Sequence, residues 1–229
     1  MEQPITDLDA LSVEMALFAR ADVEAVVTQC YGEIVAHLPS PDTEEGVVCI
    51  YPLDPAARQV RESMGGVVGE CVGGNILLRL YPDNDLARWL PYHLAHEYHH
   101  TLWGYHYFYL QGHDAPDLLA LIVSEGAADS FAHMLYPDVD VPWVRALAPD
   151  QEAAQWAALR HHLAEPGGPL YERFMFGDAK AGTPPFTGYT IGYHIVQRYL
   201  RARPEQRPDE WLAVDPWEML AVGGYDGAL

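Results

Sequence analysis

Basic residues are scarce in this chain of 229 residues. Lysine and arginine together number 13, against 33 aspartates and glutamates, and Lys180 is the only lysine. The formal net charge is −20. Proteins that bind nucleic acids or anionic membranes need clustered positive charge to contact phosphate groups. We therefore expect neither nucleic acid nor a membrane as a partner, and we assign no substrate from the charge.

Cysteine is also scarce, and a secretory signal is not recognisable. Cys30, Cys49 and Cys71 are odd in number and widely spaced, which indicates reduced thiols rather than a disulfide framework. The start of the chain, residues 1–4, has no basic residue and no apolar core of the kind that a signal peptide needs. No apolar run approaches membrane-spanning length. These features predict a cytoplasmic protein.

The glycine-rich stretch at residues 65–75 lacks the features of a nucleotide-binding loop. It has neither the order nor the lysine of a phosphate-binding loop, and no strand–helix–strand pattern surrounds it. Residues 47–51 and 75–81 on either side are predicted to be short strands, each followed by proline. These strands predict a small sheet in this part of the chain.

The segment His96-Glu97-Tyr98-His99-His100 is the most informative part of the sequence. Residues four apart lie on one face of a helix, so the imidazoles of His96 and His100 can reach the same metal ion. Glu97 lies beside the first histidine, where its carboxylate can hold a water molecule bound to that metal. Two nitrogen ligands and a base are what a zinc hydrolase requires. The alternative is a histidine-rich helix that binds no metal.

A third ligand is expected, because a catalytic zinc ion usually has three protein ligands. Apolar residues recur at helical spacing over residues 117–136, which predicts a helix. Glu125 lies in the middle of it, where a carboxylate is costly unless it is paired or bound to metal. Asp129 follows one turn later and can accept the ring N–H of a zinc-bound histidine. An exposed polar stripe is the alternative, but the small residues 126–128 favour close approach to another helix.

Three motifs in this order resemble a known family. HEYHH at residues 96–100, followed by Glu125 and Asp129 on a second helix, resembles the gluzincin metallopeptidases. HEYHH, SEGAAD at 124–129 and TGYTIGYHIV at 187–196 together resemble more closely a bacterial family of predicted zinc-dependent proteases, the YjaZ-like group, over residues 65–200. The resemblance implies one zinc ion held by His96, His100 and Glu125, with Glu97 as the catalytic glutamate and Asp129 as the aspartate that supports a ligand.

A donor for the oxyanion of peptide hydrolysis is expected in the third motif. Tyr189 and Tyr193 are four residues apart and share a face of the helix predicted over residues 188–203. We favour one of these two tyrosines, with His194 as the next candidate. The alternative is that the tyrosines only pack in the core.

The chain as a whole is predicted to be α+β and mostly helical, with a small sheet before the HEYHH helix and a helical C-terminal part. One compact domain is expected over residues 1–229, with possible lobes at 1–115 and 116–229. Helical spacing also covers residues 8–38, 150–164 and 171–176.

The function predicted from these residues is zinc-dependent cleavage of peptide bonds, by Glu97-assisted attack of a zinc-bound water. Endopeptidase action is favoured, because no motif for binding a free amine is recognisable. Three alternatives remain open. They are a non-catalytic zinc-containing binding or regulatory module, a hydrolase of a non-peptide amide, and a structural helical protein without metal. The oligomeric state is not predicted.

Overall fold

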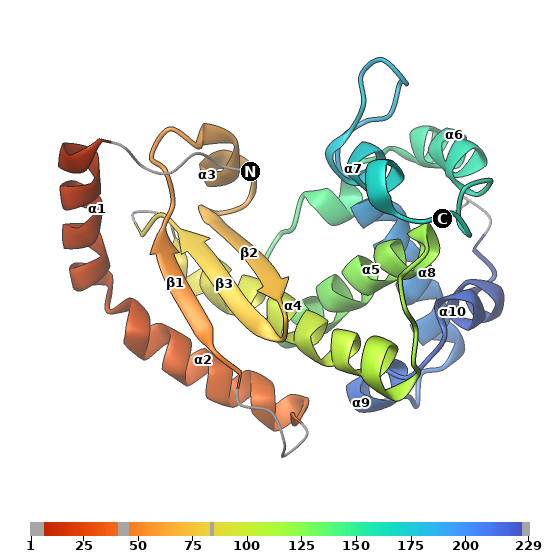
Figure 1. The fold of residues 1–229 in the computed structure, drawn as a ribbon, viewed down its shortest axis with the longest axis horizontal. Coiled ribbons are helices and arrows are strands. Elements are labelled where there is room, and N and C mark those ends of the chain that lie inside the picture. Colours follow the sequence, from red (N-terminus) through yellow and green to blue (C-terminus); the bar gives the residue numbers. More distant parts are fainter. Residues whose placement is uncertain (1–6, 41–45, 83–84, 226–229) are drawn as a thin grey trace. The chain divides into compact units, whose positions relative to one another are not determined.

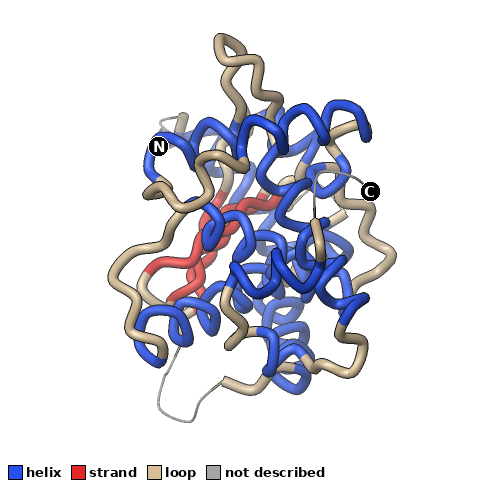
Figure 2. Tube along the Cα trace, turned by 90° about the vertical axis from the view of Figure 1, so that its right-hand side faces the viewer, coloured by secondary structure: helices blue, strands red, loops and turns tan. Residues whose placement is uncertain are grey.

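The computed structural model describes residues 7–40, 46–82 and 85–225, and Figure 1 shows its elements. Helices dominate, and the strands form one three-stranded sheet (Figure 2). The α+β, mostly helical fold predicted from the sequence is confirmed, with the sheet before the HEYHH helix and helices after it. The start of the chain at residues 1–4, which lacks the features of a signal peptide, lies outside the described residues.

The chain divides into two compact units. The first consists of Met1–Thr101 and Ala132–Asp140, and the second of Leu102–Phe131 and Val141–Leu229. Within the first unit, Arg88 donates a hydrogen bond to the backbone oxygen of Asp138 at 2.9 Å. This bond helps to attach residues 132–140 to a part of the chain that precedes them by about 50 residues. The single domain expected from the sequence stays a prediction.

Two helices, α1 (Leu8–Ala21) and α2 (Val23–His37), begin the first unit. The sequence predicts one helical block here, but Asp22 adopts a left-handed conformation with φ 46° and ψ 50° and separates the two helices. Aspartate is among the few residues that tolerate this conformation. Helix α2 buries one stripe of side chains at helical spacing, namely Val23, Val27, Cys30 and Ile34.

The sheet follows, with β1 (Val48–Pro52), the short helix α3 (Arg58–Ser63), β2 (Val67–Val72) and β3 (Asn75–Leu80). Its order is β1-β3-β2, with β1 parallel and β2 antiparallel to β3. Gly73 and Gly74 connect β2 to β3 with φ of 55° and 80°, as a tight hairpin turn requires. Strand β2 is therefore an edge strand of this sheet.

Helix α4 (Leu86–Gly104) carries the HEYHH segment, and its Glu97 lies against Gly69 of β2. The hydroxyl of Tyr98 donates to the backbone oxygen of Leu38 at 2.7 Å, and its ring meets Tyr31 edge to face. One turn earlier, Nε2 of His93 lies 3.1 Å from the backbone oxygen of Met64. These contacts fix the rotation of α4 about its own axis, and hence the direction of the residues between them.

The second unit is helical. It contains a π-helix (Tyr105–Leu110) that continues α4, most of α5 (Leu118–Leu135), and α8 (Thr187–Ala202). The remaining helices are a 3-10 turn (Trp143–Arg145), α6 (Pro149–Leu159), α7 (Gly168–Phe176), α9 (Pro208–Trp211) and α10 (Pro216–Gly223). Helix α8 contacts the 3-10 turn, α6, α7 and α10, so it is the centre of this unit.

Helices α5 and α8 cross at two glycines. A Cβ added to Gly126 would lie 2.2 Å from the carbonyl carbon of Gly192, and one added to Gly192 would lie 2.1 Å from the backbone oxygen of Ile122. The two backbones are therefore in direct contact. The prediction that small residues beside Glu125 allow close approach to another helix is confirmed, and α8 is that helix.

Helix α5 corrects the expectation that no apolar run approaches membrane-spanning length. Among the described residues it is the one helix long and apolar enough to span a membrane, with a mean hydropathy of 1.3 over 18 residues. However, 78% of this window is buried within the structure. The core helix of a globular protein is buried to this extent. Helix α5 also contains two acidic residues, Glu125 and Asp129.

Candidate metal centre

Two histidines of α4 direct their rings at one point. The Nε2 atoms of His96 and His100 lie 3.0 Å apart, and the ring centroids are 4.7 Å apart. His96 is buried and His100 is half-buried. Two bare nitrogen lone pairs at this distance repel each other, so the arrangement requires either a shared N–H proton or a cation that both nitrogens face.

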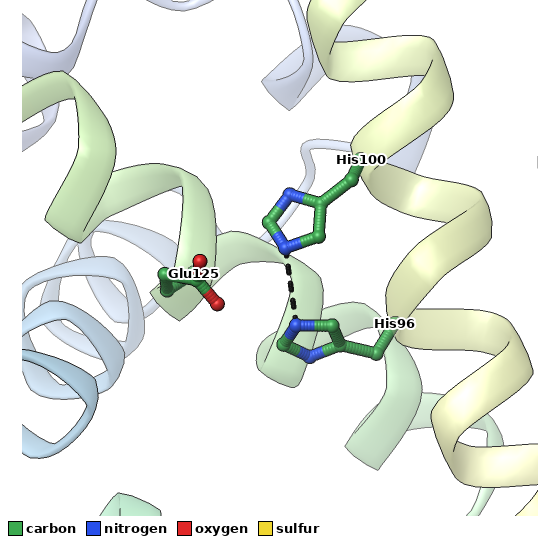
Figure 3. Close-up of side chains that lie close together, drawn as sticks. All are labelled: His96, His100 and Glu125. Atoms are coloured by element: carbon green, nitrogen blue, oxygen red, sulfur yellow. Dashed lines mark hydrogen bonds between the residues drawn. The ribbon is translucent and has the colours of Figure 1, made fainter. Parts of the chain in front are cut away.

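The carboxylate of Glu125 provides a third donor. Figure 3 shows this side chain, from α5, pointing toward the two rings from α4. One ligand atom from each of His96, His100 and Glu125 lies within 4.8 Å of the other two. Glu125 itself is buried, with 9% of its surface exposed. A buried carboxylate beside two imidazole nitrogens is a favourable site for a cation, because the cation offsets the cost of burying its charge.

The donor set fits zinc. Zinc–nitrogen bonds of about 2.0–2.1 Å at a tetrahedral angle place two histidine nitrogens roughly 3.3 Å apart, close to the 3.0 Å found between His96 and His100. Two imidazoles and one carboxylate are also a ligand set of catalytic zinc sites, which keep a fourth position open for water or substrate. The three residues thus fit one zinc ion.

Glu97 lies over the edge strand of the sheet. A Cβ added to Gly69 of β2 would lie 2.3 Å from Cγ and 2.4 Å from Oε1 of Glu97. The side chain of Glu97 therefore occupies the space above a strand residue that has no side chain. Burial, and after it the negative charge of Glu97, raises the pKa of the Cys71 thiol to about 11. Cys71 lies two residues from Gly69, on the same face of β2.

Glu125 is held by a tyrosine from α7. The hydroxyl of Tyr171 donates to Oε1 of Glu125 at 2.9 Å. A hydrogen bond to a buried carboxylate restricts its rotation and satisfies one of its oxygens. This contact is found within the second unit, and no feature of the sequence near Tyr171 predicts it.

Asp129 is held by a tryptophan. Nε1 of Trp143 lies 3.1 Å from both Oδ1 and Oδ2 of Asp129, which is completely buried. The indole thus fixes the plane of the carboxylate one turn after Glu125. The role we predict for Asp129, accepting the ring N–H of a ligating histidine, stays a prediction.

The candidates for the oxyanion donor have different surroundings. Burial, and then the negative charge of Asp129, raise the pKa of the Tyr193 phenol. Tyr189 is half-buried, and its ring meets Phe186 edge to face. The raised pKa keeps the Tyr193 phenol a neutral hydrogen-bond donor at physiological pH.

His194 takes part in a separate group of polar side chains. Its Nδ1 lies 2.9 Å from Oε1 of Glu152, a fully buried carboxylate in α6. The hydroxyl of Tyr225 donates to the same oxygen at 2.5 Å. His194 is therefore part of the contact that joins α6, α8 and the C-terminal segment.

His99, the additional histidine of HEYHH, lies on another face of α4 and is completely buried. Burial, and then the nearby His100 and His96, lower the pKa of His99 well below its ordinary value. The ring is therefore neutral and adds no positive charge beside the candidate metal ligands.

Three residues that position this site were not identified from the sequence: Gly69, Trp143 and Tyr171. Gly69 offered a signal, because a glycine inside a strand often marks the close approach of another group. Trp143 and Tyr171 offered none, since they reach Asp129 and Glu125 across the fold from positions 14 and 46 residues away.

Comparison with known families agrees with this geometry. Residues 23–221 match the family described as "Predicted Zn-dependent protease (DUF2268)". The match extends over most of the chain and includes His96, Glu97, His100 and Glu125. The chain belongs to this family. The description of this family gives zinc dependence and proteolysis as predicted properties.

Two relatives from Bacillus subtilis (strain 168) are similar to this member of the family. One, the uncharacterized protein YjfC, is 30% identical over 163 residues, which cover 66% of this chain and 52% of the relative. The other, the uncharacterized protein YjaZ, is 26% identical over 166 residues, which cover 69% of this chain and 60% of the relative. The chain thus spans between half and two thirds of these relatives. No solved structure matches the chain significantly.

Proposed function

We propose that this protein is a zinc-dependent hydrolase that cleaves peptide bonds, acting as an endopeptidase. The observation that carries the proposal is the convergence of ligand atoms from His96, His100 and Glu125 within 4.8 Å, beside a glutamate on the same helix as the histidines. Membership in a family of predicted zinc-dependent proteases supports the same chemistry.

The metal would be held by His96, His100 and Glu125. A bound zinc ion supplies a Lewis acid, which lowers the pKa of a water molecule toward neutrality and polarises the substrate carbonyl. Glu97 takes the proton of the attacking water and passes it to the nitrogen of the departing amine. A base in this role has no use in a protein that only binds zinc, so Glu97 favours catalysis over a binding or regulatory module.

The edge strand β2 offers a binding surface for an extended substrate. In the described part of the sheet, β2 pairs with β3 along one side and with no strand along the other. An extended peptide can add to such an edge by backbone hydrogen bonds. Because Gly69 of this strand lies against Glu97, a peptide bound along β2 would pass close to the proposed general base.

A phenol is proposed to stabilise the oxyanion, and Tyr189 and Tyr193 are the candidates. Both lie on α8, whose Gly192 packs against α5 beside Glu125. A neutral phenol gives up no proton at physiological pH and can donate a hydrogen bond to a developing negative charge.

We place the reaction in the cytoplasm, on a peptide or protein substrate, with neither nucleic acid nor a membrane as a partner.

The proposal is tested with the purified protein and a diverse peptide mixture, with products read by mass spectrometry and bound zinc by elemental analysis. The variant Glu97→Gln keeps the shape of the side chain and removes its basicity. We expect the native protein to carry one zinc ion and to cleave peptides internally. We expect Glu97→Gln to carry zinc and to lose at least about 100-fold in kcat.

A matched control is Glu24→Gln, which makes the same chemical change at an exposed position of α2. It should cleave at the native rate. Equal cleavage by the native protein and Glu97→Gln would show that Glu97 is not the base. Absence of bound zinc in the native protein would contradict the metal assignment.

A further inference from the structure

The segment that leads into α7 lies against the first half of α5. The backbone nitrogens of Leu118 and Leu119 donate to the backbone oxygens of Glu165 and Leu163, at 2.8 and 3.0 Å. A few residues later, a Cβ added to Gly167 would lie 2.0 Å from Cδ1 of Leu121. The backbone that enters α7 therefore lies directly against α5, within the second unit.

This attachment brings two side chains together one helical turn further along each helix. Glu125 lies four residues after Leu121, and Tyr171 lies four residues after Gly167. The backbone nitrogen of Tyr171 donates to the backbone oxygen of Gly167 at 3.0 Å. The same register therefore places the Tyr171 hydroxyl 2.9 Å from Oε1 of Glu125. The contact follows from the packing of residues 163–171 against α5.

The hydrogen bond distinguishes the two oxygens of the carboxylate. An oxygen that accepts a hydrogen bond from a phenol shares its electron density with that donor and is a poorer ligand for a metal. The other oxygen keeps its full donor strength. A carboxylate that binds through one oxygen occupies one coordination position and leaves a further position open for water.

We propose that Tyr171 is the positioning residue for the third metal ligand, and that its hydroxyl holds Oε1 of Glu125 so that the carboxylate binds the metal through Oε2 alone. This inference rests on the proposed function, since it assumes that Glu125 is a ligand. It assigns to Tyr171 a role distinct from that of Tyr189 and Tyr193, which are proposed to touch substrate.

The test is the variant Tyr171→Phe, which removes only the hydroxyl and fills the same space. A matched control is Tyr225→Phe, because Tyr225 also donates from a phenol to a buried glutamate, Glu152, that is not a candidate ligand. Native protein and both variants are stripped of metal and titrated with Co²⁺, whose visible absorption reports the number and geometry of its ligands. Zinc affinity is measured by competition with a chromophoric chelator.

We expect Tyr171→Phe to bind Co²⁺ with a changed and weaker visible spectrum, because release of Oε1 allows the carboxylate to bind through both oxygens. We expect its dissociation constant for Zn²⁺ to rise by about 10- to 100-fold, the usual effect of removing a group that supports a ligand. Tyr225→Phe should keep the native spectrum and the native zinc affinity, whatever its thermal stability.

The possible failures are distinguishable. If the native protein binds metal and Tyr171→Phe has the native spectrum and affinity, Tyr171 does not position the ligand, and the proposed function stands. If Tyr171→Phe lowers only kcat, the same conclusion holds, and the hydroxyl acts on substrate. If the native protein binds neither Co²⁺ nor Zn²⁺, the metal assignment and the inference both fail.

Discussion

At the scale of single residues, the missing side chain of Gly69 decides where Glu97 lies. The carboxylate of Glu97 is buried, with 6% of its surface exposed, and it occupies the space that a Cβ on β2 would fill. A glycine normally weakens a strand, because it has no side chain to pack. Here the absence of a side chain leaves space for Glu97, the proposed base, beside the strand that is proposed to bind substrate.

The variant Gly69→Ala tests this arrangement. The added methyl group would lie 2.3 Å from Cγ of Glu97, so the glutamate must move. A displacement of about 1 Å in a catalytic group can cost about 100-fold in rate, and we expect kcat/KM to fall by at least that factor. Bound zinc, measured by elemental analysis, should stay at the native level, because the atoms nearest to the added methyl group belong to Glu97 and not to a proposed ligand. Native activity in this variant would contradict the catalytic role of Glu97's position.

At the scale of elements, the crossing of α5 and α8 supports the helical unit. Gly126 and Gly192 allow the two backbones to touch, and the hydroxyl of Thr190 donates to the backbone oxygen of Trp143 at 2.8 Å. Trp143 in turn holds Asp129 on α5. The crossing thus links the helix of the third ligand to the helix of the proposed oxyanion donors.

The variant Gly192→Ala measures how much the crossing contributes. Its Cβ would lie 2.1 Å from the backbone oxygen of Ile122, and backbone cannot yield as a flexible side chain does. We expect the free energy of unfolding in urea to fall by about 1–3 kcal/mol, the usual cost of overpacking.

The control for this change is Gly32→Ala, at an exposed position of α2 where an added Cβ meets nothing within 4 Å. Alanine is the better helix former there, so this variant should be more stable by about 0.5–1 kcal/mol. A Gly192→Ala variant as stable as the native protein would show that the two helices can separate without cost.

At the scale of the whole molecule, this acidic protein has a net charge of −20. It buries several thiol and phenol groups, which would add further negative charge at alkaline pH. Burial raises the pKa of Cys30 to about 11, and it raises the pKa values of Tyr98 and Tyr136 above that of an ordinary phenol. All of these groups lie in the first unit, and each would add negative charge if it ionised. Their effect on folding therefore appears at alkaline pH.

The sign follows from the direction of the pKa shift. The Cys30 thiol ionises near pH 9 in the unfolded chain and near 11 in the folded protein, so its contribution to stability is complete below pH 9 and is lost as the pH rises through 11. At pH 10.5 the loss from this one group is about 2 kcal/mol. Urea unfolding at pH 8 and pH 10.5 should show a smaller loss for Cys30→Ser than for the native protein. An equal loss would mean that Cys30 ionises alike in both states.

Much of the candidate site follows from local sequence. The pairing of His96 with His100 depends only on the repeat of the α-helix, and the mid-helix position of Glu125 depends on the apolar spacing around it. The strands β1 and β3 and the helices α5, α7 and α8 begin and end within a few residues of the predicted positions, because prolines and apolar periodicity are local signals. The break at Asp22 was not predicted, since one backbone conformation separates two segments with continuous helical spacing.

The contacts that hold these groups in place were decided by tertiary structure. Tyr171 reaches Glu125 because α7 packs on α5, Glu97 lies against Gly69 because α4 packs on β2, and His194 meets Glu152 because α8 packs on α6. Each pair joins residues distant in the sequence, and no periodicity along the chain relates them. The sequence alone determined which residues can bind a metal and act as a base, whereas packing determined which neighbours fix their positions.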